Sequence, residues 1–265
     1  MGEEEFSVFI LCGGQGTRLR EETEFRPKPM VKIGDRPILW HIMKIYDHYG
    51  FRDFVLCLGY KAEMIKDYFL NYRTHRGSYR LVLRRGEVEP IKDESPIEDW
   101  RIALIDTGID TLTGTRVKRA LAVTHCRRFF LTYGDGVANI DIAALLEHHK
   151  RAGRLVTITA VRPSSRFGEL SLHGDQVRSF QEKPQVGEGW INGGFMMCER
   201  EAFDVLDDGK NAALETAVLE TLSRQGQVSV YRHEGFWQCM DTYRERGLLE
   251  DLWNSGEAAW RMWSQ

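Results

Sequence analysis

The sequence has no long apolar run and no concentration of positive charge. None of its apolar segments approaches the ~20 residues of a membrane-spanning helix. Lys and Arg form no dense run, and the formal net charge of -3 at pH 7 gives no long-range attraction to a nucleic-acid backbone. The first residues, Met1 to Phe6, are acidic, whereas a secretory signal begins with positive charge. We therefore expect a cytoplasmic protein with no nucleic-acid partner and no membrane partner.

Paired cysteine motifs are also lacking. The five cysteines are odd in number and form no CxxC pair, and the eight histidines show no metal-ligand spacing. Most of the cysteines lie inside apolar runs, which predicts buried, reduced thiols rather than disulfides or a zinc site. These cysteines are Cys12, Cys57, Cys126, Cys198 and Cys239.

The first half of the chain alternates between two kinds of segment. Short apolar runs rich in β-branched and aromatic residues predict strands, and apolar residues at helical spacing predict helices. The expected strands are Ser7–Cys12, Asp53–Leu58, Tyr79–Arg84, Arg101–Asp106 and Arg128–Tyr133. The expected helices begin near Ile38, Ala62, Arg116 and Ile142. This alternation predicts an α/β fold with a parallel sheet and right-handed crossovers, nearly complete by residue 161.

The pattern changes beyond residue 161. A hairpin is expected from Glu169–Leu172 and Gln176–Gln181, with His173-Gly174-Asp175 as its turn. Later segments predict strands at 191–198 and 227–232, a helix at 212–224 and a last helix from Thr242. With 42% hydrophobic and 28% charged residues and no linker or repeat, the 265 residues predict a single folded domain.

A glycine-rich loop follows the first expected strand. It reads Gly13-Gly14-Gln15-Gly16-Thr17-Arg18-Leu19, and Lys28 follows between two prolines. Glycines let backbone N–H groups approach a phosphate closely, while Arg18 and Lys28 can supply cationic donors. A dinucleotide fingerprint needs glycine in place of Leu19, and a Walker loop needs Lys-Ser/Thr in place of Thr17-Arg18, so neither fits. A plain strand-to-helix turn is the alternative.

Two carboxylates are candidate metal ligands. Asp135 directly follows the expected strand Arg128–Tyr133, at the edge of the sheet where open α/β folds bind ligands, although Asp-Gly is also an ordinary turn signal. Asp241 lies among apolar residues, where a carboxylate needs a partner. Because Mg²⁺ prefers one or two protein carboxylates, the pair suits this ion.

Several further motifs, together with the loop and Pro27-Lys28-Pro29, resemble the family of nucleoside-diphosphate-sugar pyrophosphorylases. These motifs are Pro37 to Met43, Gly59-Tyr60-Lys61, Asp106-Thr107-Gly108, Tyr133-Gly134-Asp135-Gly136, Phe180 to Pro184, Ile191 to Phe195, and Gly235 to Thr242. Within this family the sequence is most similar to members that use CTP and glucose 1-phosphate. Thymidylyl and uridylyl relatives usually carry Pro-Leu where this chain has Glu21-Glu22.

The resemblance implies a Rossmann-like α/β fold, with a mixed, mainly parallel sheet flanked by helices and a β-rich sugar-binding portion in the C-terminal half. It implies a nucleotide-binding core over about 1–161 and a sugar-phosphate-binding and assembly portion over about 162–265 of the single domain 1–265. Homo-oligomers are also implied.

The resemblance also assigns residues to roles. Nucleotide contacts would be Leu11, Cys12, Gly13, Gly14, Gln15, Gly16, Thr17, Arg18, Lys28, Thr111, Arg116 and Gly134. Sugar-phosphate contacts would be Glu182, Lys183 and Asn192, and Asp135 and Asp241 would bind the catalytic Mg²⁺. Arg18, Lys28 and Asp135 would act in catalysis. The chain departs from the pattern at Thr111, where serine is expected, and at Thr115, where glycine is expected.

The expected reaction is in-line attack of a sugar-phosphate oxygen on the α-phosphorus of CTP, giving CDP-glucose and pyrophosphate. Transfer of dTMP or UMP to a related sugar 1-phosphate remains an alternative. So does a non-catalytic relative that senses nucleotides or sugar phosphates, although such chains commonly lose the lysine or the metal carboxylates. Leu19 opposes a nicotinamide oxidoreductase.

Overall fold

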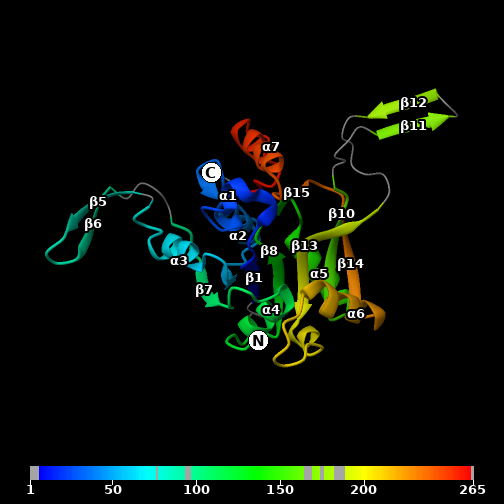
Figure 1. Ribbon diagram of the computed structural model, residues 1–265, viewed down its shortest axis with the longest axis horizontal. Coiled ribbons are helices and arrows are strands. Elements are labelled where there is room, and N and C mark those ends of the chain that lie inside the picture. The colour runs from blue at the N-terminus through cyan, green and yellow to red at the C-terminus, as the bar shows by residue number, and fades with distance from the viewer. Residues whose placement is uncertain are drawn as a thin grey trace.

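A mixed sheet forms the centre of the molecule (Figure 1). The computed structural model describes residues 6–75, 77–92, 97–163, 169–173, 176–181 and 189–263. Within these residues the sheet has seven strands. In spatial order they are β14 (Val228–His233), β10 (Val156–Val161), β13 (Ile191–Glu199), β8 (Arg128–Tyr133), β1 (Ser7–Cys12), β4 (Asp53–Leu58) and β7 (Arg101–Asp106).

One strand of this sheet runs against the others. β13 is antiparallel to both of its neighbours, β8 and β10, while β1, β4, β7 and β8 pair in parallel, as do β10 and β14. The predicted α/β fold with a mixed, mainly parallel sheet is therefore confirmed.

Helices cover both faces of the sheet. The strand β1 shows why, because Val8 and Ile10 face one hydrophobic core while Phe9 and Leu11 face the other. The first core is closed by α2 (Ile38–His48), α3 (Ala62–Leu70), α5 (Ile142–Ala152) and α7 (Tyr243–Asn254). The second is closed by α4 (Thr113–Leu121), a π-helical segment Leu214–Leu219 and α6 (Glu220–Arg224). The short α1 (Arg20–Thr23) follows the glycine-rich loop.

The expectation that the sheet is nearly complete by residue 161 is wrong. β13 and β14 both come from beyond this residue, and β13 lies between β8 and β10 in the interior of the sheet. Its core, Phe195 to Cys198, is fully apolar and buried, as a strand covered on both faces must be. The C-terminal part of the chain is therefore needed to complete the central sheet.

In the part of the chain that the structure describes, four two-stranded ladders lie outside the central sheet. They are β2 (Lys32–Ile33) with β3 (Arg36–Pro37), β5 (Ser78–Val82) with β6 (Glu87–Lys92), β9 (Gly136–Ala138) with β15 (Trp237–Cys239), and β11 (Glu169–His173) with β12 (Gln176–Gln181). The predicted pairing of these last two strands is confirmed, while Gly174 and Asp175 of the expected turn lie outside the described residues. The expected strand Tyr79–Arg84 corresponds to β5, which pairs with β6 in an arm that projects from the body, on the opposite side from β11 and β12 (Figure 1).

Helix α7 begins at a capping box. The Thr242 hydroxyl accepts a hydrogen bond from the backbone N–H of Glu245 at 3.3 Å, and the Glu245 carboxylate accepts one from the backbone N–H of Thr242 at 2.8 Å. Two N–H groups that lack partners inside the helix are thereby satisfied. The predicted start of the last helix at Thr242 is confirmed.

Candidate active site

The glycine-rich loop leaves β1 and turns tightly at Gly16. This residue has a positive φ of 64°, and a Cβ there would lie 2.8 Å from a methyl group of Thr23. The Thr23 hydroxyl lies 3.0 Å from the carbonyl oxygen of Gly16 and 2.9 Å from that of Leu19, within hydrogen-bonding distance of both. Glycine is therefore required at position 16, and Thr23 holds the loop against α1.

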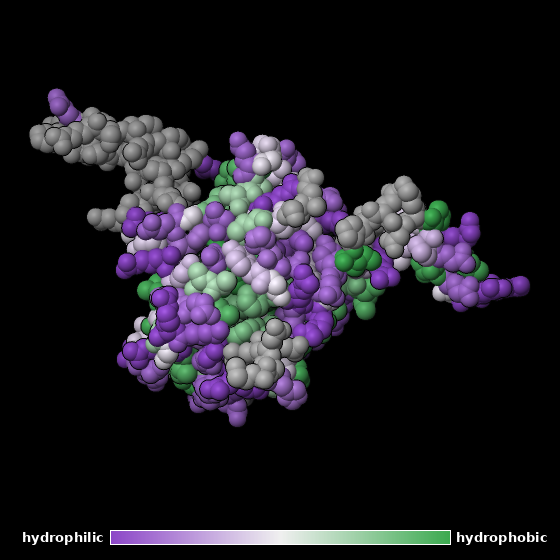
Figure 2. All heavy atoms as spheres, turned by 180° about the vertical axis from the view of Figure 1, so that it is seen from behind, coloured by the Kyte–Doolittle hydropathy of each residue, from purple (hydrophilic) through white to green (hydrophobic). Residues whose placement is uncertain are grey.

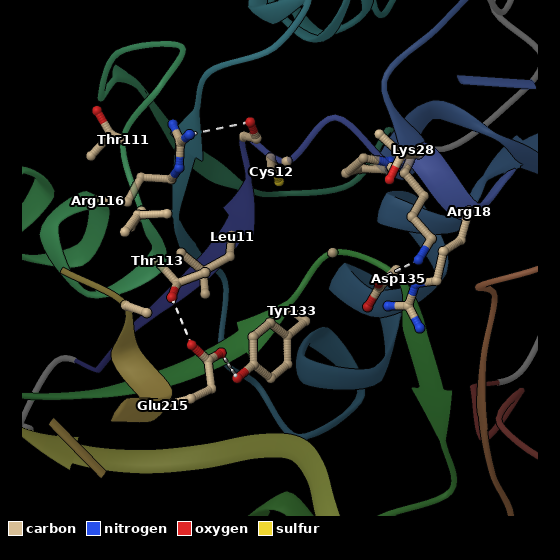
Figure 3. A pocket seen from close by; sticks show the side chains of 18 residues that line it. Leu11, Cys12, Arg18, Lys28, Thr111, Thr113, Arg116, Tyr133, Asp135 and Glu215 are labelled. Carbon is tan, nitrogen blue, oxygen red and sulfur yellow. Dashed lines mark hydrogen bonds and ion pairs between the residues drawn. The ribbon is translucent and has the colours of Figure 1, made fainter. Parts of the chain in front are cut away.

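Lys28 lies between the two carboxylates that the sequence singled out. Its Nζ donates to Asp135 at 2.7 Å and to Asp241 at 2.5 Å, although the side chain comes from a different part of the chain. Arg18 pairs with the other oxygen of Asp241 at 2.8 Å, and its side chain is 72% exposed. The structure thus brings together all four charged residues that were predicted for the catalytic and metal roles. Figure 3 shows three of them, Arg18, Lys28 and Asp135, close together.

The ladder of β9 and β15 explains how Asp241 reaches Asp135. Gly136 pairs with Cys239 in this antiparallel ladder, and the Met240 N–H donates to the Asp135 carbonyl at 2.8 Å. Asp135 precedes β9 and Asp241 follows β15, so the ladder places the two carboxylates at the same end. Residues far apart in sequence are therefore held side by side by backbone hydrogen bonds.

Lys28 remains charged although it is buried. Burial lowers the pKa of its ammonium, but Asp135 and Asp241 outweigh that effect, and the net pKa lies above its ordinary value. Burial raises the pKa of Asp241, while Lys28 and Arg18 pull it below its ordinary range. Lys28 is 8% exposed, so water screens the interactions of its ammonium with Asp135 and Asp241 only weakly. The partner that a carboxylate amid apolar residues requires is supplied here by the two cations.

The two carboxylates suit Mg²⁺ in number and chemistry. Both direct an oxygen atom toward one point, which the Lys28 ammonium occupies. Among the residues that the structure describes, no group of three or more acidic, His or Cys side chains is arranged to hold a metal. Because Mg²⁺ takes only one or two protein carboxylates and completes its shell with phosphate oxygens and water, two suffice for an ion that binds with a nucleotide.

A cleft of about 460 Å³ connects these charges with the predicted nucleotide-binding residues. Its Lys28 end carries Arg18, Lys28 and Asp135, and its opposite end carries Thr113 and Glu215 (Figure 3). The predicted residues that line it are Leu11, Cys12, Gly13, Gly14, Gly16, Thr17, Arg18, Lys28, Thr111, Arg116, Gly134 and Asp135. The cleft lies at the carboxyl edge of the parallel strands, the usual ligand site of open α/β sheets.

Four of the remaining predicted residues lie elsewhere or outside the described part. Gln15 lines a neighbouring cavity of about 370 Å³ with Arg20 and Tyr60. Asn192 is the second residue of β13, where its side-chain oxygen accepts from the Gly194 N–H at 2.9 Å, and it is not among the residues lining the cleft. Glu182 and Lys183 lie outside the described residues.

Arg116 fastens two loops of the cleft wall. It is 3% exposed, and its guanidinium donates to the carbonyls of Leu58 at 2.8 Å and Gly108 at 2.7 Å. It also donates to the Gly13 carbonyl at 3.2 Å, and a Cβ on Gly13 would lie 2.2 Å from the guanidinium. The guanidinium therefore holds the glycine-rich loop against the loop after β7, and its donors are engaged within the protein.

Thr111 and Thr115 have similar internal roles. The Thr111 hydroxyl donates to the Thr107 carbonyl at 2.6 Å, which closes the loop before α4. Thr115, which stands where glycine is expected, lies within α4 without a positive φ, and its hydroxyl accepts from the Ala212 N–H at 2.8 Å. Glycine is not required at position 115, because the Thr115 hydroxyl joins α4 to the segment that carries Glu215.

Three residues that line the cleft were not predicted as site residues from the sequence. Tyr133, Thr113 and Glu215 line the cleft, and the Tyr133 hydroxyl donates to Glu215 at 2.6 Å. Tyr133 was recognisable as the last residue of a strand before Gly134-Asp135, and Thr113, the first residue of α4, follows Thr111 by two positions. Nothing in the local sequence marks Glu215, which reaches the cleft only because its helical segment packs on α4.

The fold and the cleft together define a class of protein. A glycine-rich loop after the first strand, a buried lysine and two converging carboxylates at the edge of the sheet are suited to a nucleoside polyphosphate with a divalent cation. The chain belongs to the Nucleotidyl transferase family, which matches residues 7–258.

Individual relatives agree with this family. The chain is 46% identical to a glucose-1-phosphate cytidylyltransferase of Salmonella typhimurium, over 96% of this chain and 98% of the relative. It is 42% identical to a probable glucose-1-phosphate cytidylyltransferase of Bacillus subtilis, over 96% and 98% of the two chains. The crystal structure of HddC from Yersinia pseudotuberculosis has the same fold, with a TM-score of 0.68 over 94% of this chain and 99% of that one at 21% identity.

Proposed function

We propose that the protein transfers CMP from CTP to α-D-glucose 1-phosphate, forming CDP-glucose and releasing pyrophosphate. The observation that carries this proposal is the similarity to the Salmonella cytidylyltransferase over nearly the full length of both chains. The cleft agrees with it, because the lysine and both carboxylates that non-catalytic relatives commonly lose are present and adjacent.

The reaction needs positioning more than proton transfer. A phosphate monoester has a second pKa near ~6, so the attacking oxygen of glucose 1-phosphate is already ionised at neutral pH. This oxygen forms a bond to the α-phosphorus as the bond from that phosphorus to the bridging oxygen of pyrophosphate breaks. Catalysis then rests on bringing two polyanions together in line and neutralising their charge.

Different charged residues at the Lys28 end of the cleft position the substrates and neutralise their charge. Arg18 and the N–H groups of residues 13–17 hold the triphosphate, and Lys28 exchanges its carboxylate partners for phosphate oxygens when the substrate is bound. Asp135 and Asp241 hold Mg²⁺, which supplies charge neutralisation between the phosphates. Lys183, Glu182 and Asn192 contact the sugar phosphate, and residues 162–265 form the sugar-binding and assembly portion of the single domain.

The proposal includes a homo-oligomer. The β5–β6 hairpin carries exposed apolar side chains, of which Leu83 is 87% and Ile91 is 63% exposed. Figure 2 shows hydrophobic groups on this projecting arm among hydrophilic ones. Apolar groups on an extended arm suit contact with another subunit, and light scattering during size exclusion would give the subunit number.

The cytoplasm is the proposed location. All five cysteines are free thiols in the structure, and three of them are buried, which suits a reducing compartment. Within the described residues, no helix has the length and apolar character needed to span a membrane.

Initial rates of pyrophosphate release test the proposed function. The purified protein is assayed with Mg²⁺ and glucose 1-phosphate, and CTP, UTP and dTTP are compared at equal concentration. The proposal predicts that CTP gives the highest kcat/KM. Preference for UTP or dTTP would assign the enzyme to another nucleotide, and silence with all three would favour a protein that binds without catalysis.

A further inference from the structure

Glu215 places a negative charge in a cleft that, on the proposed function, receives a polyanion. Its carboxylate lines the cleft at the end opposite Lys28 (Figure 3). Within the part of the chain that the structure describes, Glu215 forms no ion pair, because its contacts are with neutral hydroxyl groups. An uncompensated carboxylate at this place repels phosphates and can accept a hydrogen bond from a neutral donor in the ligand.

Two hydroxyl groups fix the orientation of this carboxylate. Tyr133 donates to Oε1 at 2.6 Å, and Thr113 donates to Oε2 at 2.9 Å. The Thr113 hydroxyl itself accepts from the Leu214 N–H at 2.8 Å, so its hydrogen is directed to Glu215. A carboxylate has about four acceptor sites. Two of these are engaged here, and the others are available to a ligand.

The buried cation of the cleft wall, Arg116, does not compensate Glu215. Arg116 lines the cleft but is 3% exposed, and its guanidinium donates to the carbonyls of Leu58, Gly108 and Gly13. The other cations that line the cleft, Arg18 and Lys28, pair with the carboxylates of the Lys28 end. The cleft therefore has a cationic end suited to phosphates and an accepting end suited to N–H or O–H groups.

We infer that Glu215 is a nucleoside-recognition residue, whose carboxylate accepts a hydrogen bond from an N–H or O–H donor of the nucleoside. The inference rests on the proposed function, since it takes the triphosphate to lie at the Lys28 end. The donor has two possible sources, the exocyclic amine of cytosine and the ribose 2′-hydroxyl. Uracil has a carbonyl where cytosine has the amine, and an oxygen there would be repelled by Glu215.

Equilibrium binding of CTP, UTP and dCTP, measured by calorimetry, tests this role without requiring turnover. The proteins compared are the wild type, Glu215→Gln, Tyr133→Phe and the control Glu220→Gln. Glu220 is an exposed carboxylate of α6, paired with Arg224 at 4.0 Å, and it does not line the cleft. Removing a negative charge strengthens binding of every triphosphate alike, so the ratios between ligands are the decisive readout.

In Glu215→Gln we expect one of the two affinity ratios, CTP/UTP or CTP/dCTP, to fall by roughly 10- to 100-fold, which is the range that a hydrogen bond to a charged group spans. Collapse of the CTP/UTP ratio assigns the amine as the donor, and collapse of the CTP/dCTP ratio assigns the ribose 2′-hydroxyl. Tyr133→Phe should move the same ratio by a smaller factor, because it only loosens Glu215. Glu220→Gln should leave both ratios unchanged.

Two results would overturn the inference. The first is that both affinity ratios keep their wild-type values in Glu215→Gln. The second is that the control Glu220→Gln changes a ratio as much as Glu215→Gln does. Turnover of wild-type protein with CTP and glucose 1-phosphate is measured separately. An inactive wild type that still binds CTP in a Glu215-dependent way would refute the proposed function and retain this inference.

Discussion

At the scale of single residues, the site depends on Lys28 as an internal cation. Its ammonium fills the position between Asp135 and Asp241 that a divalent cation would take. The sequence identified these three residues from local signals, namely two flanking prolines, the end of a strand and a carboxylate among apolar neighbours. It gave no sign that the lysine would pair with both carboxylates, because that contact is made by tertiary structure.

Replacing Lys28 by Met should strengthen binding of Mn²⁺ in the absence of nucleotide. The ammonium competes with the metal for the two carboxylates, and losing its charged hydrogen bonds should raise the Mn²⁺ affinity by roughly 10- to 100-fold. Turnover should fall, since the triphosphate loses a cationic contact. Electron paramagnetic resonance of free Mn²⁺ gives the affinity.

The matched control for this measurement is Lys32→Met, which removes an exposed lysine of β2. The thermal midpoint of Lys28→Met should fall without metal and recover with Mn²⁺, because two partly buried carboxylates lose the cation that they share. Unchanged or weaker Mn²⁺ binding in Lys28→Met would show that Lys28 does not compete for the metal position.

At the scale of elements, helix α7 begins directly after Asp241, one of the two proposed metal ligands. The Glu245 carboxylate accepts from the backbone N–H of both Asp241 and Thr242, at 2.7 and 2.8 Å. The helix cap therefore fixes the backbone that carries Asp241. The pattern Thr242-x-x-Glu245 is a capping-box signature visible in the sequence, whereas the pairing of β9 with β15 is between segments about 100 residues apart and has no local signal.

Thr242→Ala should lower the free energy of unfolding by about 1 kcal/mol, the usual value of a lost N-cap. Thr242→Ser keeps the hydroxyl and should retain wild-type stability, so urea unfolding of both variants isolates the cap. Turnover should also fall in the alanine variant, since the Asp241 backbone is less well held. Equal stability of the two variants would show that the cap contributes nothing.

At the scale of the whole molecule, two segments from the second half of the chain, β13 and the C-terminal segment, pack against structure formed by the first half. The sequence predicted β1, β4, β7 and β8 with the bounds that the structure shows, because each is a short apolar run ended by turn residues. It did not predict that β13 enters the sheet interior, since strand order is decided by long-range packing. Glu215 was missed for the same reason. The assignment of Lys183 and Glu182 to the sugar phosphate remains a prediction.

The C-terminal segment closes over helix α2 through a buried histidine. His41 Nε2 donates to the Ile33 carbonyl at 3.0 Å, and its Nδ1 accepts from Trp260 Nε1 at 3.4 Å, which describes a neutral ring. Burial is the main cause that lowers the pKa of His41 from 6.5 to about 4. The ring joins a residue of the first half to the end of the chain.

This histidine predicts how stability depends on pH. Above pH 6.5 the ring is neutral in both the folded and the unfolded state, so its contribution is fully present. As the pH falls from 6.5 toward 4, only the unfolded chain takes up the proton, and stability should drop by about 1.4 kcal/mol per pH unit. Chemical unfolding between these values should show a steeper decline for wild type than for His41→Gln. Identical slopes would contradict the assignment.

The central claim is the transfer of CMP from CTP to glucose 1-phosphate. Phosphorus-31 NMR of a reaction with Mg²⁺, CTP and glucose 1-phosphate tests it most directly, because it identifies every phosphorus-containing product. The proposed reaction predicts the coupled diphosphate signals of CDP-glucose and an equal amount of inorganic pyrophosphate. Accumulation of CMP or inorganic phosphate without CDP-glucose, or no consumption of CTP, would contradict it.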